Sequence, residues 1–183
     1  MEITMSDYIT TYTGTHIIPT KPSAELIYIA DIAHALSLIC RGNGHVKTFF
    51  SVGQHCIHCA REAAARGYSD RVVLACLLHD ASEAYMSDVP RPFKQYLNQY
   101  KEFEDQLLTV IYTKYLGSPL TETEAAFVKE IDDDMLYYDL SVLLNETSPE
   151  PAPVMKSEFS YEVLPFEEVE KEYLEMVGRY WER

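Results

Sequence analysis

The sequence predicts an all-α protein that folds as a single domain over residues 1–183. Three observations support this fold class. Apolar residues recur at helical spacing along most of the chain, glycines, prolines and capping residues separate these runs, and no segment alternates polar and apolar residues for long enough to build a sheet. A chain of 183 residues with 47% hydrophobic content can bury one ordinary core.

The first two predicted helices lie before residue 68. The stretch AELIYIADIAHALSLIC, residues 24–40, has helical apolar spacing, and the two glycines of RGNG interrupt it. The next run, SVGQHCIHCAREAAARG, covers residues 51–67. Ser51 can act as its N-cap, and Gly67 stands where the C-terminus of a helix favours a left-handed residue.

Ser69 opens the next predicted helix, which covers DRVVLACLLHDASEAY without a break. The stretch DVPRPFKQY interrupts it, because a proline ring removes a helical hydrogen bond and clashes with the preceding turn. A further helix is expected over roughly residues 98–116, where the sequence GSP ends it.

The C-terminal third begins with a capping box. Thr121 and Glu124 have the required spacing at the start of a long predicted helix that ends at about Glu146. Residues 145–165, rich in Pro, Ser and Glu, are expected to form a loop. An amphipathic helix over residues 166–182 is expected to follow.

The net charge of −14 is concentrated in this C-terminal third. Residues 1–120 contain 12 acidic and 10 basic residues, whereas residues 121–183 contain 17 acidic and 5 basic ones. An acidic surface repels duplex nucleic acid and anionic membranes, which bind proteins through basic patches. We therefore expect neither polymeric nucleic acid nor a membrane as a partner. A small anionic ligand held in a local basic pocket is compatible with this net charge.

Targeting signals are not evident in the sequence. No stretch approaches the roughly 20 consecutive apolar residues that a membrane span requires. The start, MEITMSDYIT, lacks the basic region and apolar stretch of a signal peptide. The expected location is therefore the cytoplasm.

The cysteines are expected to be ordinary core or helix-face residues. They are Cys40, Cys56, Cys59 and Cys76. Structural zinc usually needs a second pair of ligands beyond one CxxC, and no such pair follows. A thioredoxin-like motif would follow a strand, whereas this CxxC lies within a helical pattern.

The dipeptide His79-Asp80 can form part of a metal site. On a helix these side chains point about 100° apart, so they share an ion only if it lies between them. His55 and Asp132, on two other predicted helices, are candidates to complete the site. Two imidazoles and two carboxylates suit a borderline transition metal ion. An HD dipeptide also occurs by chance, and a histidine at a helix end is often structural.

Three motifs in fixed order resemble the HD-domain metal-dependent phosphohydrolases. They are SVGQH at 51–55, LLHDASEAYMSDVPRPFK at 77–94 and VKEIDDDMLYYD at 128–139. The likeness is nearest to the subgroup of YfbR-type 5'-deoxynucleotidases and phage HD nucleotide phosphohydrolases, and it runs from about Asp31 to Asp139. It implies an HD-domain helical bundle with a motif core at about 31–139 and an acidic loop and helix at 146–183.

The resemblance implies that four side chains bind one divalent metal ion, which could be Co, Mn, Zn, Fe or Mg. These are His55, His79, Asp80 and Asp132. Asp132 is chosen over its neighbours Asp133 and Asp134 because the family pattern places the ligand four residues after Val128. Simple solvation is the expected role of the two neighbours.

Glu83 and Asp88 are the expected acid/base and water-positioning groups, again by resemblance. Glu83 lies four residues after His79, which places it on the same face of a continuous helix. A nearby carboxylate can take the proton of a water activated by a metal ion. The alternative for Glu83 is an exposed charge in the last helical turn.

Basic residues are needed to hold a phosphate. The resemblance implies that Arg41 and Lys94 contact the substrate phosphate and suggests that His45 lies near the pocket, whereas Arg91 is expected to be a surface charge. YfbR-type enzymes carry a Trp at the position of Gly42, where it lies against the sugar and helps to select deoxynucleotides. The resemblance therefore supports phosphate-ester hydrolysis more strongly than it supports a deoxynucleotide substrate.

The expected function is that of a 5'-nucleotidase that releases phosphate from ribo- or deoxyribonucleoside monophosphates through metal-activated water. One alternative is a deoxynucleoside triphosphate triphosphohydrolase. Another is a catalytically silent nucleotide-binding or regulatory protein that uses the acidic 166–183 helix for interaction. The expected partner is a nucleotide, and a homodimer is left open.

The same resemblance suggests that Asp31 and His34 lie near the pocket, although a hydrogen-bonded core histidine is the favoured interpretation of His34.

Overall fold

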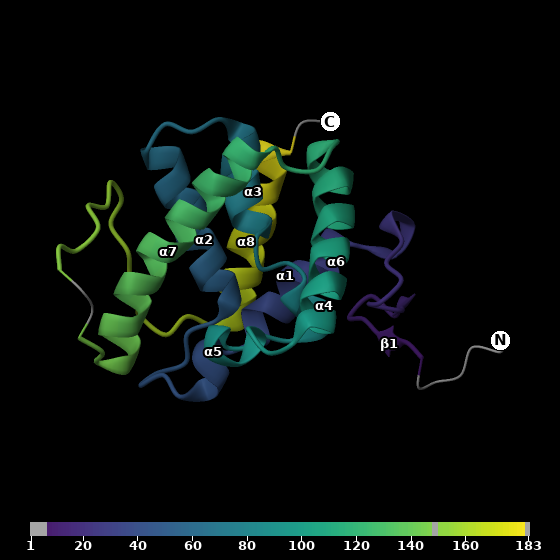
Figure 1. The fold of residues 1–183 in the computed structure, drawn as a ribbon, viewed down its shortest axis with the longest axis horizontal. Coiled ribbons are helices and arrows are strands. Elements are labelled where there is room, and N and C mark those ends of the chain that lie inside the picture. Colours follow the sequence, from purple (N-terminus) through teal and green to yellow (C-terminus); the bar gives the residue numbers. More distant parts are fainter. Residues whose placement is uncertain (1–6, 148–149, 182–183) are drawn as a thin grey trace.

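The computed structural model describes residues 7–147 and 150–181, and it confirms the all-α prediction (Figure 1). The helices are α1 (Ile29–Leu38), α2 (Val52–Ala65), α3 (Asp70–Leu78), α4 (Glu83–Met86), α5 (Arg91–Lys94), α6 (Asn98–Leu116), α7 (Glu122–Leu144) and α8 (Phe166–Tyr180). In the described part of the chain the strands are β1 (Ile9–Thr10) and β2 (His16–Ile17), which pair antiparallel as a small hairpin.

The helices pack around α8, which contacts α1, α2 and α3. Helix α7 packs against α2 and α3, while α6 packs against α3 and lies on the other side of the molecule in Figure 1. The core between these helices consists of fully buried apolar side chains, among them Leu36, Cys56, Leu77, Ile111, Ile131 and Tyr173. Burial of this apolar surface is the main force that holds the helices together.

The predicted caps explain where three of the helices begin. The Ser51 side chain accepts a hydrogen bond from the backbone of Gln54 at the start of α2, and Thr121 and Glu124 form the expected capping box of α7. Ser69 caps α3 in the same way. Each cap satisfies a backbone N–H that has no partner within its own helix.

The first predicted helix, residues 24–40, is shorter than expected. Ala24–Leu26 form only a short helical turn, and α1 begins at Ile29. Between them the carbonyl of Ile27 accepts hydrogen bonds from Lys114 and Tyr115 of α6. Because α6 uses this carbonyl, the backbone stays extended there instead of continuing one helix.

The expected continuous helix from Ser69 to Tyr85 is wrong. Helix α3 ends at Leu78, and α4 begins at Glu83 after a turn. At the break, Nδ1 of His79 lies 2.8 Å from the carbonyl oxygen of Cys76 and donates a hydrogen bond to it. The His79 side chain thus hydrogen-bonds to a carbonyl of the last turn of α3, where the helix ends. Glu83 therefore reaches the site from the separate short helix α4.

The segment 150–165 has no helix or strand, as predicted, but it is firmly attached to α2 and α7. Glu62 of α2 is fully buried and accepts hydrogen bonds from Arg66, from the backbone N–H groups of Lys156 and Ser157, and from the Ser157 hydroxyl. These donors lower the pKa of Glu62 although burial alone would raise it. The Gln54 side chain also donates to the carbonyl of Glu162. The segment therefore forms part of the packed structure.

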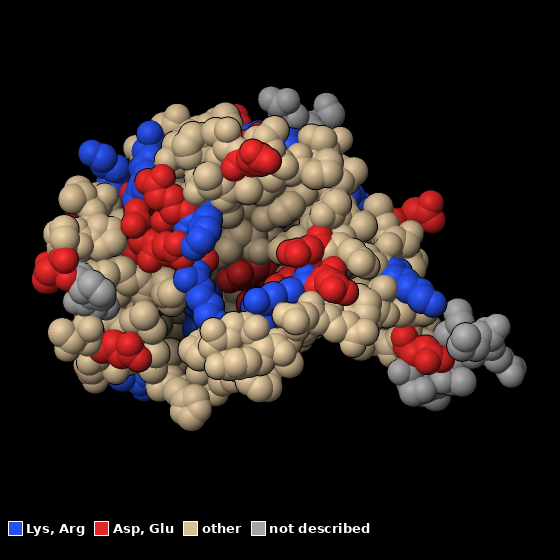
Figure 2. Space-filling view, in the orientation of Figure 1, with Lys and Arg blue, Asp and Glu red and all other residues tan. Residues whose placement is uncertain are grey.

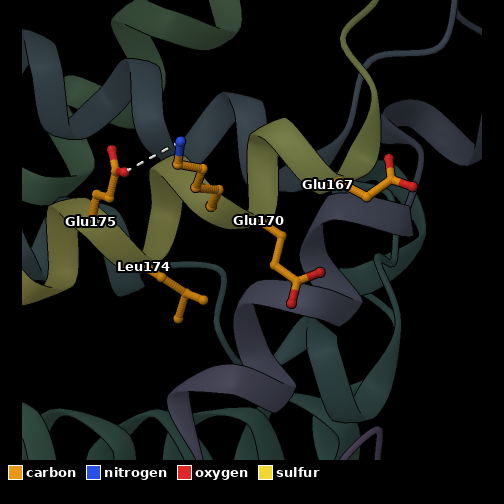
Figure 3. Close-up of a pocket in the computed structure, with 5 residues that line it drawn as sticks. Glu167, Glu170, Leu174 and Glu175 are labelled. Atoms are coloured by element: carbon orange, nitrogen blue, oxygen red, sulfur yellow. Dashed lines mark ion pairs between the residues drawn. The ribbon is translucent and has the colours of Figure 1, made fainter.

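Helix α8 buries one face and exposes an acidic one. Val169, Tyr173, Met176 and Val177 point into the core. The outer face carries a shallow groove lined by Glu167, Glu170, Lys171, Leu174 and Glu175 (Figure 3). The helix ends at Tyr180, two residues before the predicted end at Glu182, and Glu182 lies outside the described residues.

The sequence prediction about targeting concerned the start of the chain and its apolar segments. Residues 1–6 lie outside the described part of the chain. Within the described part, no helix combines the length and apolar character needed to cross a bilayer.

Candidate metal centre

His55 of α2 is completely buried and is held by a carboxylate from α7. Its Nδ1 lies 2.8 Å from Oδ2 of Asp139. The same Oδ2 accepts a hydrogen bond from Arg41, and Oδ1 of Asp139 accepts one from the Tyr161 hydroxyl. Burial raises the pKa of Asp139, but His55, Arg41 and Tyr161 outweigh this effect and lower it. With Nδ1 engaged, Nε2 of His55 is the ring nitrogen left for a ligand, as in histidines oriented for metal binding.

Asp139 was not predicted as a site residue. A usable signal was its spacing, since it follows Asp132 by seven residues, or about two helical turns, and therefore shares its face of α7. The same spacing is common in amphipathic helices, so it marks a shared face without indicating a role.

His79 stands at the break between α3 and α4. The bond from its Nδ1 to the carbonyl of Cys76 fixes the ring, and Nε2 lies 3.3 Å from Nε2 of His55. The same Nε2 is 3.3 Å from Oδ2 of Asp80 and 3.6 Å from Oδ1 of Asp132. His55 Nε2 is 3.3 Å from Asp132 Oδ1 and 3.9 Å from Asp80 Oδ2.

Three of these separations, at 3.3 Å, are those expected between neighbouring ligands of a metal ion, and the other two, at 3.6 and 3.9 Å, are somewhat wider. With metal–ligand bonds of about 2.1 Å, neighbouring ligand atoms are about 3.0 Å apart in an octahedron and about 3.4 Å apart in a tetrahedron. The structure thus brings together four predicted side chains, from α2, from the α3–α4 break and from α7. Two imidazole nitrogens and two carboxylate oxygens are a donor set suited to a divalent transition metal ion.

The charges around these atoms favour a cation. Burial raises the pKa of Asp80 and of Asp132, but the neighbouring imidazoles of His79 and His55 lower both values well below the usual range. Burial lowers the pKa of His79, and the adjacent Asp80 outweighs this and raises it well above its usual value. The pair of carboxylates that favours a proton on the imidazole also favours a divalent ion in its place.

Three cysteines are buried as predicted, but two of them also border the metal-capable cluster. In the described chain, the donor atoms of His55, Cys59 and His79 lie within 4.8 Å of one another, and so do those of Cys56, His79 and Asp80. The interpretation of these thiols as ordinary core residues was therefore incomplete. Sequence spacing gave a partial signal, because Cys59 follows His55 by one helical turn.

Glu83 lies against this cluster in a nearly dry environment. Glu83 is only 4% exposed, and its Oε2 has no hydrogen-bond partner among the described residues. Burial, together with the negative charges of Asp80 and Asp88, raises the pKa of Glu83 well above its usual value. Burial also raises the pKa of Asp88, although Arg41 opposes the shift. Raised carboxyl pKa values of this kind are typical of groups that exchange protons.

Both predicted phosphate-binding cations pair with carboxylates, Arg41 within the cluster and Lys94 with Glu104 of α6. Arg41 is largely buried and donates to Asp80 and Asp139 over 3.3 and 3.2 Å. Nζ of Lys94 donates to Glu104 over 2.7 Å, and burial lowers the pKa of Lys94, but Glu104, and to a smaller extent Glu83 and Asp80, outweigh this and raise it. Figure 2 shows a hollow on this face of the molecule, with acidic side chains in its floor and basic ones at its rim.

Arg91 does more than the expected surface charge. Its guanidinium is about half exposed and pairs with both Asp132 and Asp133, so it joins α5 to a candidate metal ligand on α7. His45, in contrast, is exposed, and its side chain has no hydrogen bond or ring contact with the cluster in the described structure. Its loop nevertheless borders the site, because the backbone of Gly42 hydrogen-bonds to Asp88, so the role of His45 in substrate binding stays a prediction.

Asp31 and His34 are engaged elsewhere. Asp31 is buried and accepts hydrogen bonds from the backbone and hydroxyl of Thr13, which anchors the N-terminal hairpin. Nδ1 of His34 lies 2.9 Å from Glu170 of α8, and its ring stacks on Tyr12. The expected hydrogen bond of His34 is present, but the residue lies at the partly exposed edge of α1 and not in the core.

Comparison with known proteins assigns no activity to this chain. It is 37% identical over 120 residues to an uncharacterized protein, YfdR, of Escherichia coli, a match that covers 66% of this chain and 65% of that protein. It is also 34% identical over 100 residues to an uncharacterized protein of Rhodobacter capsulatus. That match covers 51% of this chain and 50% of that protein. The chain thus spans less than two thirds of either relative. No protein-family model matches it.

Proposed function

We propose that this chain is a metal-dependent phosphohydrolase of the HD type that releases phosphate from nucleoside monophosphates. The observation that carries the proposal is the convergence of His55 and His79 Nε2 with carboxylate oxygens of Asp80 and Asp132, at separations of 3.3–3.9 Å. These residues come from three sequence segments that resemble HD-domain enzymes in order and composition.

The four converging side chains would hold one divalent metal ion. Such an ion supplies Lewis acidity, which lowers the pKa of water and offsets negative charge on a phosphoryl oxygen. Asp139 keeps the His55 ring in the tautomer that presents Nε2, and the carbonyl of Cys76 does the same for His79. Metal identity among Co, Mn, Zn, Fe and Mg is open to direct measurement.

The remaining site residues handle protons and phosphate. Oε2 of Glu83 has no hydrogen-bond partner among the residues that the structure describes, so it can accept the proton of the attacking water. Asp88, with its raised pKa, is suited to position that water or to protonate the leaving oxygen. Arg41 and Lys94 supply positive charge for the non-bridging phosphate oxygens, where charge develops during the reaction.

The nucleoside would meet an open turn after Arg41. Gly42 and Asn43 both have left-handed backbone angles, with φ of 59° and 54°. A bulky aromatic residue at position 42 would be strained in that conformation, even though a Cβ there would find only Val46 at 3.7 Å. We therefore infer that this position contributes little to the choice between ribose and deoxyribose.

The direct test is product release from a panel of ribo- and deoxyribonucleoside mono-, di- and triphosphates. Protein freed of metal by a chelator receives Mn²⁺ or Co²⁺, and Asp80→Asn is compared with Asp105→Asn, a matched change at an exposed position of α6. Orthophosphate from monophosphates that disappears only in Asp80→Asn supports the proposal. Intact triphosphate from deoxynucleoside triphosphates would replace it by a triphosphohydrolase. Nucleotide binding without turnover would leave a regulatory protein.

A further inference from the structure

The candidate metal centre has thiols on its inner side. Cys59 follows His55 by one turn of α2, and its Sγ lies 3.5 Å from Nε2 of His55. Sγ and the imidazole donors of His55 and His79 lie within 4.8 Å of one another. The same two imidazoles therefore belong to two donor sets, one completed by carboxylates and the other by sulfur.

The two sets differ in exposure as well as in chemistry. The side chains of Asp80 and Asp132 are about one fifth exposed, at 20% and 21%, whereas Cys59 is buried. Carboxylate oxygens suit hard ions such as Mn²⁺ and Mg²⁺, while thiolates select soft ions. A cation can thus be held from the solvent side through oxygen or from the interior through sulfur.

We propose that this centre has a second, sulfur-containing binding mode in which His55, Cys59 and His79 hold a thiophilic divalent ion such as Zn²⁺ or Cd²⁺. This inference rests on the proposed metal site and assigns it a form of regulation. A sulfur–metal bond replaces the S–H bond of Cys59, and the proton leaves to solvent, so the ion enters with loss of one proton.

Cys59 is the better sulfur donor of the two that border the cluster. Cys56 groups with His79 and Asp80, a set with one imidazole and one carboxylate. Cys59 groups with both imidazoles, which are the donors that zinc combines most often with sulfur. Because the two imidazoles cannot serve two ions at once, an ion bound through Cys59 excludes an ion bound through Asp80 and Asp132, which is the mode that the proposed hydrolysis uses.

Metal binding by single-thiol variants tests the inference without relying on turnover. The full chain, freed of metal, is titrated with Cd²⁺ by ultraviolet absorption, where a thiolate-to-cadmium charge-transfer band reports a sulfur ligand, and with Mn²⁺ by electron paramagnetic resonance. Cys59→Ser is compared with Cys56→Ser and with Cys40→Ser, whose half-buried thiol belongs to neither donor group. The band should disappear only in Cys59→Ser.

The same variant should separate soft from hard ions. Cys59→Ser should weaken Cd²⁺ binding by about tenfold or more and leave Mn²⁺ affinity within about twofold. An equal fall for both ions would mean that the thiol acts through packing, and a band lost in Cys56→Ser instead would reassign the ligand; either result overturns the inference. A protein that hydrolyses nucleotides with Mn²⁺ but shows no thiolate band loses only this inference. A thiolate band without hydrolysis rejects only the proposed activity.

Discussion

His58 gives a pH-dependent test of how the segment 150–165 is held on α2. The residue is 4% exposed, and its ring packs among those of Phe50, Phe159 and Tyr161. Its Nδ1 has no hydrogen-bond partner among the described residues. Burial lowers the pKa of His58 to about 4, with Asp139 opposing the shift and His55 and Arg61 adding to it.

The sign and size of the effect follow from linkage. The folded pKa of about 4 lies below the ordinary value of 6.5, so the unfolded chain takes up the proton first as the pH falls. Stability is therefore fully present above about pH 6.5 and declines until the pH passes below about 4. The shift corresponds to about 3 kcal/mol in total, of which about 2 kcal/mol is lost between pH 7 and pH 5.

Urea unfolding of metal-free protein at pH 7 and pH 5 measures this loss. His58→Phe keeps an aromatic ring in the cluster and removes the titrating group, so its free energy of unfolding should fall by about 2 kcal/mol less than that of the wild type over this range. His45→Phe, at an exposed histidine, should behave like the wild type. Equal pH dependence in wild type and His58→Phe would refute the reasoning, because it would show that His58 is protonated without cost in the folded protein.

Three further substitutions test the site and its support. Asp139→Asn should weaken metal binding about 10- to 100-fold by calorimetry, since His55 loses the charged acceptor that orients it; unchanged affinity would remove Asp139 from the site. Glu62→Ala should lower the free energy of unfolding by about 3 kcal/mol in urea, because Arg66 and two backbone N–H groups lose their buried partner; a loss below about 1 kcal/mol would contradict this. Under the proposed function, Lys94→Ala should lower kcat/KM for a nucleoside monophosphate about 100-fold while Mn²⁺ affinity stays the same, and a parallel loss of Mn²⁺ binding would assign Lys94 to the metal centre instead.

Much of the fold could be predicted from the sequence because its signals are local. Apolar spacing and the caps at Ser51, Ser69 and Thr121 depend on a few neighbouring residues, and they placed the starts of α2, α3 and α7 correctly. The helix breaks near Ile27 and at His79 depend on side chains that donate hydrogen bonds to backbone carbonyls. At Ile27 the donor is Lys114 of α6, and at the other break it is His79 itself. Helical periodicity does not report such competition.

In the candidate site too, some residues could be identified from the sequence and others only from their contacts in the structure. The four converging donors were assigned through the resemblance of three sequence motifs to HD-domain enzymes. Asp139 and Glu62 were missed because a buried carboxylate looks like any surface carboxylate until its donors are known. Apart from Arg66, four residues away, the donors to Glu62 lie more than 90 residues away at Lys156 and Ser157. The role of Arg91 was underestimated because its partners lie on α7.

The attachment of the segment 150–165 and of α8 means that the folded unit extends beyond the residues that carry the candidate metal ligands. A fragment of residues 31–144 would retain every proposed metal ligand. It would also expose the apolar surfaces of α1, α2 and α3 that α8 covers, and deprive the Asp139 and Glu62 carboxylates of donors from Tyr161 and Ser157. A fragment that ends after the last candidate ligand would thus lose part of the core, because Val169, Tyr173 and Val177 of α8 belong to it.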